Sequence, residues 1–348
     1  MRRSLVAMAI LVLSSCGNSA APKPTPSPTP SASATPIASA TTTALPLGRI
    51  AAAMAYDQPR HAVLLFGGLA DQTLLDDTWT WNGSGWSQHQ GLTQSPRARQ
   101  RPSMAYDEAN RNVVLFGGLT ADGQQNDTWS WNGTAWQQLH PAHSPSAREG
   151  AGMTYDPSLK AVILYGGMND ATAKPSAINE TWSWNGSDWS PLSPAQSPAG
   201  GVRPRLAFLS GANVVARFGD CIESNDNGLY TFDGQTWTAH QATGTWPPAL
   251  CIPALAGDTG RNQLVLFGGL IGSAIVTPPP ADTWLYDGHA WTRATPAQSP
   301  PARSDATMVF DSDHHVMVLF GGQGLIQGQT GPLNDTWTWD GNSWTQHQ

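Results

Sequence analysis

Residues 104–136 read MAYDEANRNVVLFGGLTADGQQNDTWSWNGTAW. In this stretch a short polar turn separates residues 104–107 from the apolar run 113–116, and Gly117-Gly118 ends the run. Residues 127–131 alternate Trp with small polar residues, as a half-buried strand does. Asn132-Gly133 is typical of a tight hairpin turn, in which both central residues adopt positive φ. We therefore expect four short antiparallel strands from this single stretch.

The same unit occurs six times along the chain, at intervals of about 50 residues. One four-stranded sheet cannot bury both of its faces, whereas six such sheets packed around an axis can. The repeat therefore predicts an all-β fold, a six-bladed β-propeller whose first and last blades meet by packing. The expected blades are residues 49–90, 99–140, 148–193, 201–241, 250–295 and 303–347.

The repeat resembles that of the kelch family. The matching features are the Gly-Gly doublet after an apolar strand, the aromatic pair that follows and the Trp beyond it. This resemblance covers residues 49–345 and implies a kelch-type propeller. The fourth unit departs most, because Gly219-Asp220 replaces the doublet and Tyr230 and Phe232 replace two Trp.

The composition excludes some classes of protein. Only 12% of the 348 residues are charged, and the formal net charge is −7, so a basic nucleic-acid binder is not expected. A wholly disordered chain would not carry 16 Trp. Fifteen of these Trp fall on the repeat, so we interpret them as blade packing rather than as a ligand platform.

The first residues predict export. Arg2 and Arg3 precede a short apolar segment, and Leu13-Ser14-Ser15-Cys16 resembles the cleavage site of bacterial lipoproteins. We expect residues 1–15 to be a signal peptide and 16–46 a lipidated, disordered Pro/Ser/Thr/Ala tether. Residues 47–348 would then be a monomeric extracytoplasmic domain, held at a bacterial membrane through the acyl chains on Cys16 alone. The alternative is an ordinary secretion signal with a chance Cys.

Four arginines stand at the start of the innermost strand of their units: Arg49, Arg99, Arg148 and Arg303. The third strand of each of these units opens on a carboxylate: Asp77, Asp127, Glu180 and Asp335. The starts of the first and third strands of a meander lie about 9–10 Å apart, within reach of an extended Arg. The favoured interpretation is an ion pair that ties each blade. The alternative is a positive ring at the channel mouth that binds an anion.

Cys221 begins the loop between the second and third strands of the fourth unit, and Cys251 follows Leu250, which stands at the Arg position of the fifth unit. Both therefore fall on the loop face that carries the arginines. Because an exported protein is in a compartment that permits disulfides, we expect a bridge between them. Two free buried thiols are the alternative. The nine His scatter over turns and outer strands, so we expect neither a metal site nor a cofactor.

Long apolar loops follow the Gly-Gly doublets of the fifth and sixth units, and they contain Ile271, Ile275, Val276, Leu325 and Ile326. Variable loops on a rigid scaffold commonly bind partners, although these loops could instead fold over the channel mouth. We expect a non-catalytic module that binds a protein or a glycan. One alternative is a sugar-active enzyme resembling the kelch-type sialic acid mutarotase, with Glu149 or Glu223 moving protons. Another is a structural envelope protein without a ligand.

Overall fold

The structure is a computed structural model, and it describes residues 45–169, 176–219, 221, 228–242, 244–271, 279–326 and 328–347. The expected signal peptide and the part of the expected tether up to residue 44, including Cys16, lie outside the described residues. So do three residues that the sequence singled out as candidate site residues: Glu223, Ile275 and Val276.

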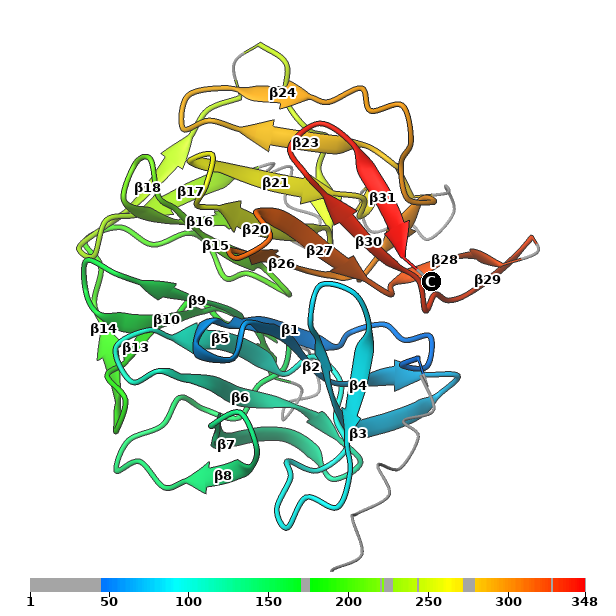
Figure 1. The fold of residues 1–348 in the computed structure, drawn as a ribbon. Helices are drawn as coiled ribbons and strands as arrows, with labels where there is room; N and C mark the ends of the chain where they lie inside the picture. Colours follow the sequence, from blue (N-terminus) through cyan, green and yellow to red (C-terminus); the bar gives the residue numbers. More distant parts are fainter. Residues whose placement is uncertain are drawn as a thin grey trace, which may run out of the picture. The chain divides into compact units, whose positions relative to one another are not determined.

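The described chain is all-β and contains six four-stranded antiparallel sheets, in each of which the strands pair in chain order (Figure 1). This confirms the expectation of repeated four-stranded units. The first three sheets consist of β1 (Ala53–Asp57), β2 (Ala62–Ala70), β3 (Thr73–Trp81) and β4 (Trp86–His89); β5 (Ser103–Asp107), β6 (Asn112–Thr120), β7 (Gly123–Trp131) and β8 (Trp136–Leu139); and β9 (Gly152–Asp156), β10 (Ala161–Tyr165), β13 (Thr181–Trp184) and β14 (Trp189–Leu192). The other three consist of β15 (Arg205–Leu209), β16 (Val214–Phe218), β17 (Leu229–Phe232) and β18 (Trp237–His240); β20 (Ala254–Asp258), β21 (Gln263–Phe267), β23 (Thr283–Tyr286) and β24 (Trp291–Arg293); and β26 (Thr307–Asp311), β27 (Val316–Phe320), β30 (Thr336–Trp339) and β31 (Trp344–His347).

Three smaller sheets lie in the loops of the described chain. They are β11 (Met168–Asn169) with β12 (Ser176–Ala177), β19 (Leu250–Cys251) with β22 (Leu270–Ile271), and β25 (Arg303–Ser304) with β28 (Gln323–Ile326) and β29 (Gln329–Pro332). One short 3₁₀ turn, Gln58–Arg60, follows β1.

The hairpin turns differ from the expected tight form. Trp81 pairs with Trp86, so the turn between them has four residues, Asn82 to Gly85. Of these residues only Gly83 has a positive φ, at 91°. The Asn82 side chain instead accepts hydrogen bonds from the backbone N–H groups of Ser84 and Gly85. Asn or Asp is therefore needed as a turn cap, and the Gly after it for its backbone conformation.

The Gly-Gly doublets are explained by close approach between neighbouring sheets. A Cβ on Gly67 would lie 2.8 Å from the carbonyl oxygen of Arg99, and Gly67 has a φ of 64°. The N–H of Gly68 donates to that same carbonyl. The Gly322 N–H donates to the Arg49 carbonyl in the same way, which links the sixth sheet to the first.

The hydrophobic core lies between the faces of successive sheets. The first strands contact one another in order, from β1 through β5, β9, β15 and β20 to β26, and β26 also contacts β1. In five of the six sheets, the Trp that opens the fourth strand donates its Nε1–H to a buried Thr in the third strand of the preceding sheet. These bonds, 2.8–3.0 Å long, join Trp136 to Thr78, Trp189 to Thr128, Trp237 to Thr181, Trp344 to Thr283 and Trp86 to Thr336.

Candidate functional site

The four arginines at the blade starts are buried and paired. The Nη1 and Nη2 atoms of Arg99 donate to the two carboxylate oxygens of Asp127 at 2.6 and 2.8 Å, and Nη1 also donates to the Gly117 carbonyl. Arg49 with Asp77, and Arg303 with Asp335, repeat this geometry. Arg148 donates to Glu180 at 2.5 Å. Each of these arginines is 1% exposed.

The carboxylates of these pairs also hold a Trp. Asp127 accepts from Nε1 of Trp129, and Asp335 accepts from Nε1 of Trp337. Burial opposes ionisation of Asp335, but the hydrogen bond and the charge of Arg303 outweigh it and hold the pKa of Asp335 below its usual range. An Arg neutralised in this way has little potential left to attract an anion. Two cavities, described below, lie among the first strands of the sheets. The described lining of neither cavity includes any of these four arginines.

The fourth sheet lacks this pair and is tied in another way. Gly201 stands at the Arg position, and the guanidinium of Arg217, from β16, approaches to 3.1 Å of where a Cβ on Gly201 would be. Arg217 is 1% exposed, with its guanidinium carbon 5.1 Å from the ring centre of Tyr230. Sequence reasoning missed this residue, although an Arg within the apolar run Val-Val-Ala-Arg-Phe was a visible signal.

The predicted disulfide is confirmed. Cys221 and Cys251 are bridged, with their Cα atoms 4.7 Å apart. The bond joins the loop after β16 to β19, so it staples the fourth unit to the fifth. It lies where the Arg–carboxylate pairs are missing from both units.

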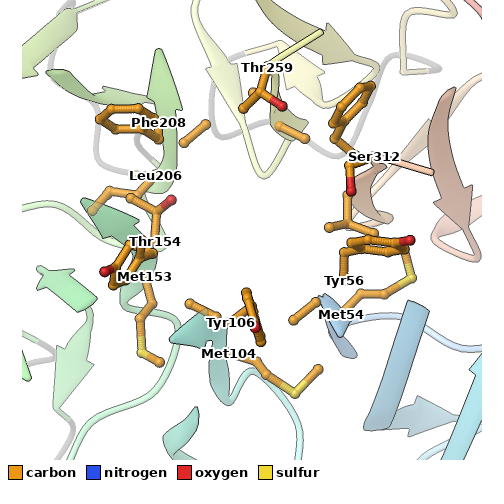
Figure 2. Close-up of a pocket in the computed structure, with 18 of the residues that line it drawn as sticks. Met54, Tyr56, Met104, Tyr106, Met153, Thr154, Leu206, Phe208, Thr259 and Ser312 are labelled. Carbon is orange, nitrogen blue, oxygen red and sulfur yellow. The ribbon is translucent and has the colours of Figure 1, made fainter. Parts of the chain in front are cut away.

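A cavity of about 300 Å³ lies among the first strands of all six sheets, and we call it the main cavity (Figure 2). Aromatic side chains from equivalent positions form a collar around it: Tyr56, Tyr106, Tyr155, Phe208 and Phe310. Burial raises the phenol pKa of the three tyrosines, so their hydroxyls stay neutral. The cavity reaches solvent at the turns after the first strands, where Gln58, Glu108, Pro157 and Thr259 are exposed.

A second cavity of about 100 Å³, here the small cavity, adjoins the main one. Both are lined by the same six side chains, one from each sheet: Met54, Met104, Met153, Leu206, Leu255 and Met308. The charged residue in the described lining of the small cavity is Arg205.

Five charged residues form a network beside the small cavity, and we call it the charged network. Arg101 lies 3.8 Å from Glu149 and 3.3 Å from Asp305. Arg203 lies 3.6 Å from Glu149, and Arg205 lies 3.0 Å from Asp305. The network thus runs between the second, third, fourth and sixth units and places Glu149, a predicted proton-transfer acid, between two arginines.

The predicted binding loops are partly described. Ile271, Leu325 and Ile326 are 47%, 57% and 43% exposed. Leu325 and Ile326 belong to β28, which pairs with β29 in a projecting hairpin (Figure 1). A cleft of about 410 Å³ lies between this hairpin and Asp71, at the tip of the β2–β3 hairpin. The described loops therefore leave apolar side chains exposed to solvent.

Within the part of the chain that the structure describes, no group of three or more His, Cys, Asp or Glu residues is placed to hold a metal ion. Several His side chains pair instead with a single carboxylate or hydroxyl, as His143 does with Asp188. No helix among the described residues is long and apolar enough to cross a membrane.

Comparison with known proteins gives no family assignment. The sequence matches no family model, and it matches no curated protein.

Proposed function

We propose that this chain is an exported, lipid-anchored six-bladed propeller of the kelch type that acts as a non-catalytic binding module for a protein or a glycan. Contacts between β1 and β26, and the hydrogen bond from Trp86 to Thr336, support a ring in which the sixth blade meets the first. The anchor rests on the resemblance of residues 13–16 to a lipoprotein cleavage site.

The exposed apolar hairpin carries the proposal of binding. Leu325 and Ile326 project on β28 beyond the four-stranded sheet of their unit. Apolar side chains exposed together on a rigid scaffold are typical of interaction sites. The cleft between Asp71 and β29 extends this surface toward the first unit. We therefore assign partner binding to the loops of the fifth, sixth and first units.

Capture by three versions of the full chain, each with Cys16→Ser to prevent lipidation, tests this surface. The wild-type surface should retain a partner from a surface-protein extract or a glycan array. Ile271→Asp, Leu325→Asp and Ile326→Asp together should weaken capture at least about tenfold. Leu159→Asp changes an exposed Leu in the turn between β9 and β10, at the opposite end of a sheet, and should leave capture unchanged. Equal capture by the triple variant would remove this surface from the proposal.

A second candidate is a sugar-active enzyme resembling the kelch-type sialic acid mutarotase. The observation that favours it is Glu149, which is 2% exposed and lies between Arg101 and Arg203. A carboxylate beside two arginines suits the binding of an acidic sugar and the movement of a proton. NMR exchange between the anomers of N-acetylneuraminic acid tests this candidate, with Glu149→Gln as the variant that should abolish acceleration. If the wild-type protein does not accelerate exchange, the candidate is dropped; if capture also fails, a structural envelope role is what is left.

A further inference from the structure

Arg205 is a charged side chain at a position where the other five units carry small residues. Its counterparts at the start of the first strand are Ala53, Ser103, Gly152, Ala254 and Thr307. Small residues keep the channel wide there, whereas Arg205 brings a guanidinium to the lining of the small cavity. Its side chain is 30% exposed, so it is accessible from the channel.

The charged network holds more positive than negative charge. The three arginines Arg101, Arg203 and Arg205 share two carboxylates, those of Glu149 and Asp305. Arg205 donates from Nη2 to Asp305 and from Nε to the Pro253 carbonyl. Burial lowers the pKa of Arg203 and the nearby charge of Arg101 lowers it further, while Glu149 and Asp305 act in the opposite direction. One excess positive charge suits a monoanion better than a dianion.

The exposed lining of the main cavity is mostly apolar, whereas that of the small cavity around Arg205 is mostly polar. Four Met and two Leu belong to the lining of both cavities; each is 7–8% exposed, and the rest of its surface packs in the core between the sheets. Unbranched Met side chains adapt to irregular ligands and contact aromatic rings favourably. The main cavity is also lined by the aromatic collar, and it reaches solvent at the rim, where Gln58 and Glu108 are exposed. A molecule entering at the rim would therefore pass these polar side chains, then meet the apolar surface of the main cavity, and reach a guanidinium last.

We propose that the channel binds a small amphipathic monocarboxylate, with its carboxylate paired to Arg205 and its apolar body against the Met side chains and the aromatic collar. Arg–carboxylate pairs combine charge with directed hydrogen bonds, and the apolar lining favours an alkyl or aryl body over a sugar. This site is separate from the loop surface of the proposed function, and it does not depend on that function.

Isothermal titration of the full chain with Cys16→Ser tests the site, with octanoate and 3-phenylpropanoate as probes. At least one of the two should bind saturably, and its primary amide should bind at least about tenfold more weakly because it cannot form the ion pair. Arg205→Ser places in the fourth unit the residue type that Ser103 provides in the second, and it should cause a similar loss. Arg97→Ser, whose side chain is 74% exposed and pairs with the exposed Asp122, is the matched control and should bind as the wild type does.

A second variant keeps the result interpretable if Arg205→Ser perturbs the channel. Thr154→Trp fills the main cavity without changing a charge, and it should also abolish binding. Near-ultraviolet circular dichroism reports whether each variant retains its packed Trp. The proposal is overturned if neither carboxylate binds, or if binding survives both substitutions. It is also overturned if octyl phosphate or N-acetylneuraminic acid binds more tightly than both probes.

Discussion

The second and fourth sheets have the same four-stranded topology but differ in how they are tied together. In the second sheet Arg99 pairs with Asp127, and Trp136 donates to Thr78 of the first. In the fourth, glycines 201 and 228 stand at both ion-pair positions. Leu229 occupies the Thr position, and the Nε1–H of Trp291, which should reach it, has no hydrogen-bond partner among the described residues.

The fourth unit lacks both members of the ion pair, whereas the fifth lacks only the Arg, since Leu250 stands at that position and Asp282 pairs with Arg293. A buried Arg without its carboxylate would be a lone charge, and each Arg at this position does have its carboxylate. Arg217 and the disulfide Cys221–Cys251 are the fourth unit's own ties. The four-stranded topology is therefore the same with the Arg–carboxylate pair and without it.

The largest loss of stability is expected from breaking the Arg99–Asp127 ion pair of the second sheet. Arg99→Met leaves the Asp127 carboxylate mostly buried without its partner and should lower the free energy of unfolding by about 3–5 kcal/mol. Urea unfolding followed by Trp fluorescence measures this. The double variant Arg99→Met with Asp127→Leu should recover part of the loss, because no lone charge remains. Arg97→Met, 74% exposed, is the control and should change stability by less than about 0.5 kcal/mol.

Removing the disulfide of the fourth unit should lower the free energy of unfolding by nearly as much. The disulfide closes a loop of 30 residues, so Cys221→Ser with Cys251→Ser should cost about 3–4 kcal/mol. Unfolding with and without dithiothreitol checks the result, since the reductant should destabilise the wild type and leave the double variant unchanged. A double variant as stable as the wild type would show that Arg217 alone ties the fourth unit.

Much of this comparison could be predicted from the sequence, and some of it could not. Asp-Thr-Trp-x-Trp and Gly-Gly recur in register, so the four-stranded units and the joint loss of Arg and carboxylate in the fourth were visible. The charged network was not, because Arg101, Glu149 and Asp305 come from three units and are brought together by the packing of first strands. The position of Arg205 in the lining of the small cavity could not be predicted either. It becomes apparent only when the six first strands are packed together and the other five units are seen to have small residues there.

A smaller effect is expected at the Trp–Thr hydrogen bonds. Thr78→Val keeps the side-chain shape but leaves the Trp136 Nε1–H buried without an acceptor, which should cost about 1–2 kcal/mol. In the fourth unit this bond is already missing, so Trp291→Phe should cost about 1 kcal/mol less than Trp136→Phe. Urea unfolding of the three variants measures both differences. If the two Trp substitutions cost the same, the hydrogen bond contributes nothing beyond ring packing.

The smallest effect on stability is expected at a His–Thr contact. This contact occurs both in the first unit, which has the Arg–carboxylate pair, and in the fourth, which lacks it. The Nε2 atoms of His89 and His240 lie 3.1 and 2.8 Å from the hydroxyl oxygens of Thr80 and Thr231. Burial lowers the pKa of both His below 6.5, the value taken for the unfolded chain. Between the two pKa values the unfolded chain binds more protons, so stability present above pH 6.5 is lost as the pH falls.

His89→Gln and His240→Gln should therefore each reduce the loss of stability between about pH 7 and pH 5, and by similar amounts. Urea unfolding at both pH values measures this, with the exposed His140→Gln as a control that should leave the pH dependence unchanged. The carboxylates with lowered pKa values, such as Asp335, titrate at lower pH and do not contribute in this window. A smaller effect for His240→Gln would mean that the fourth unit differs from the others at its outer strands as well as at its ties.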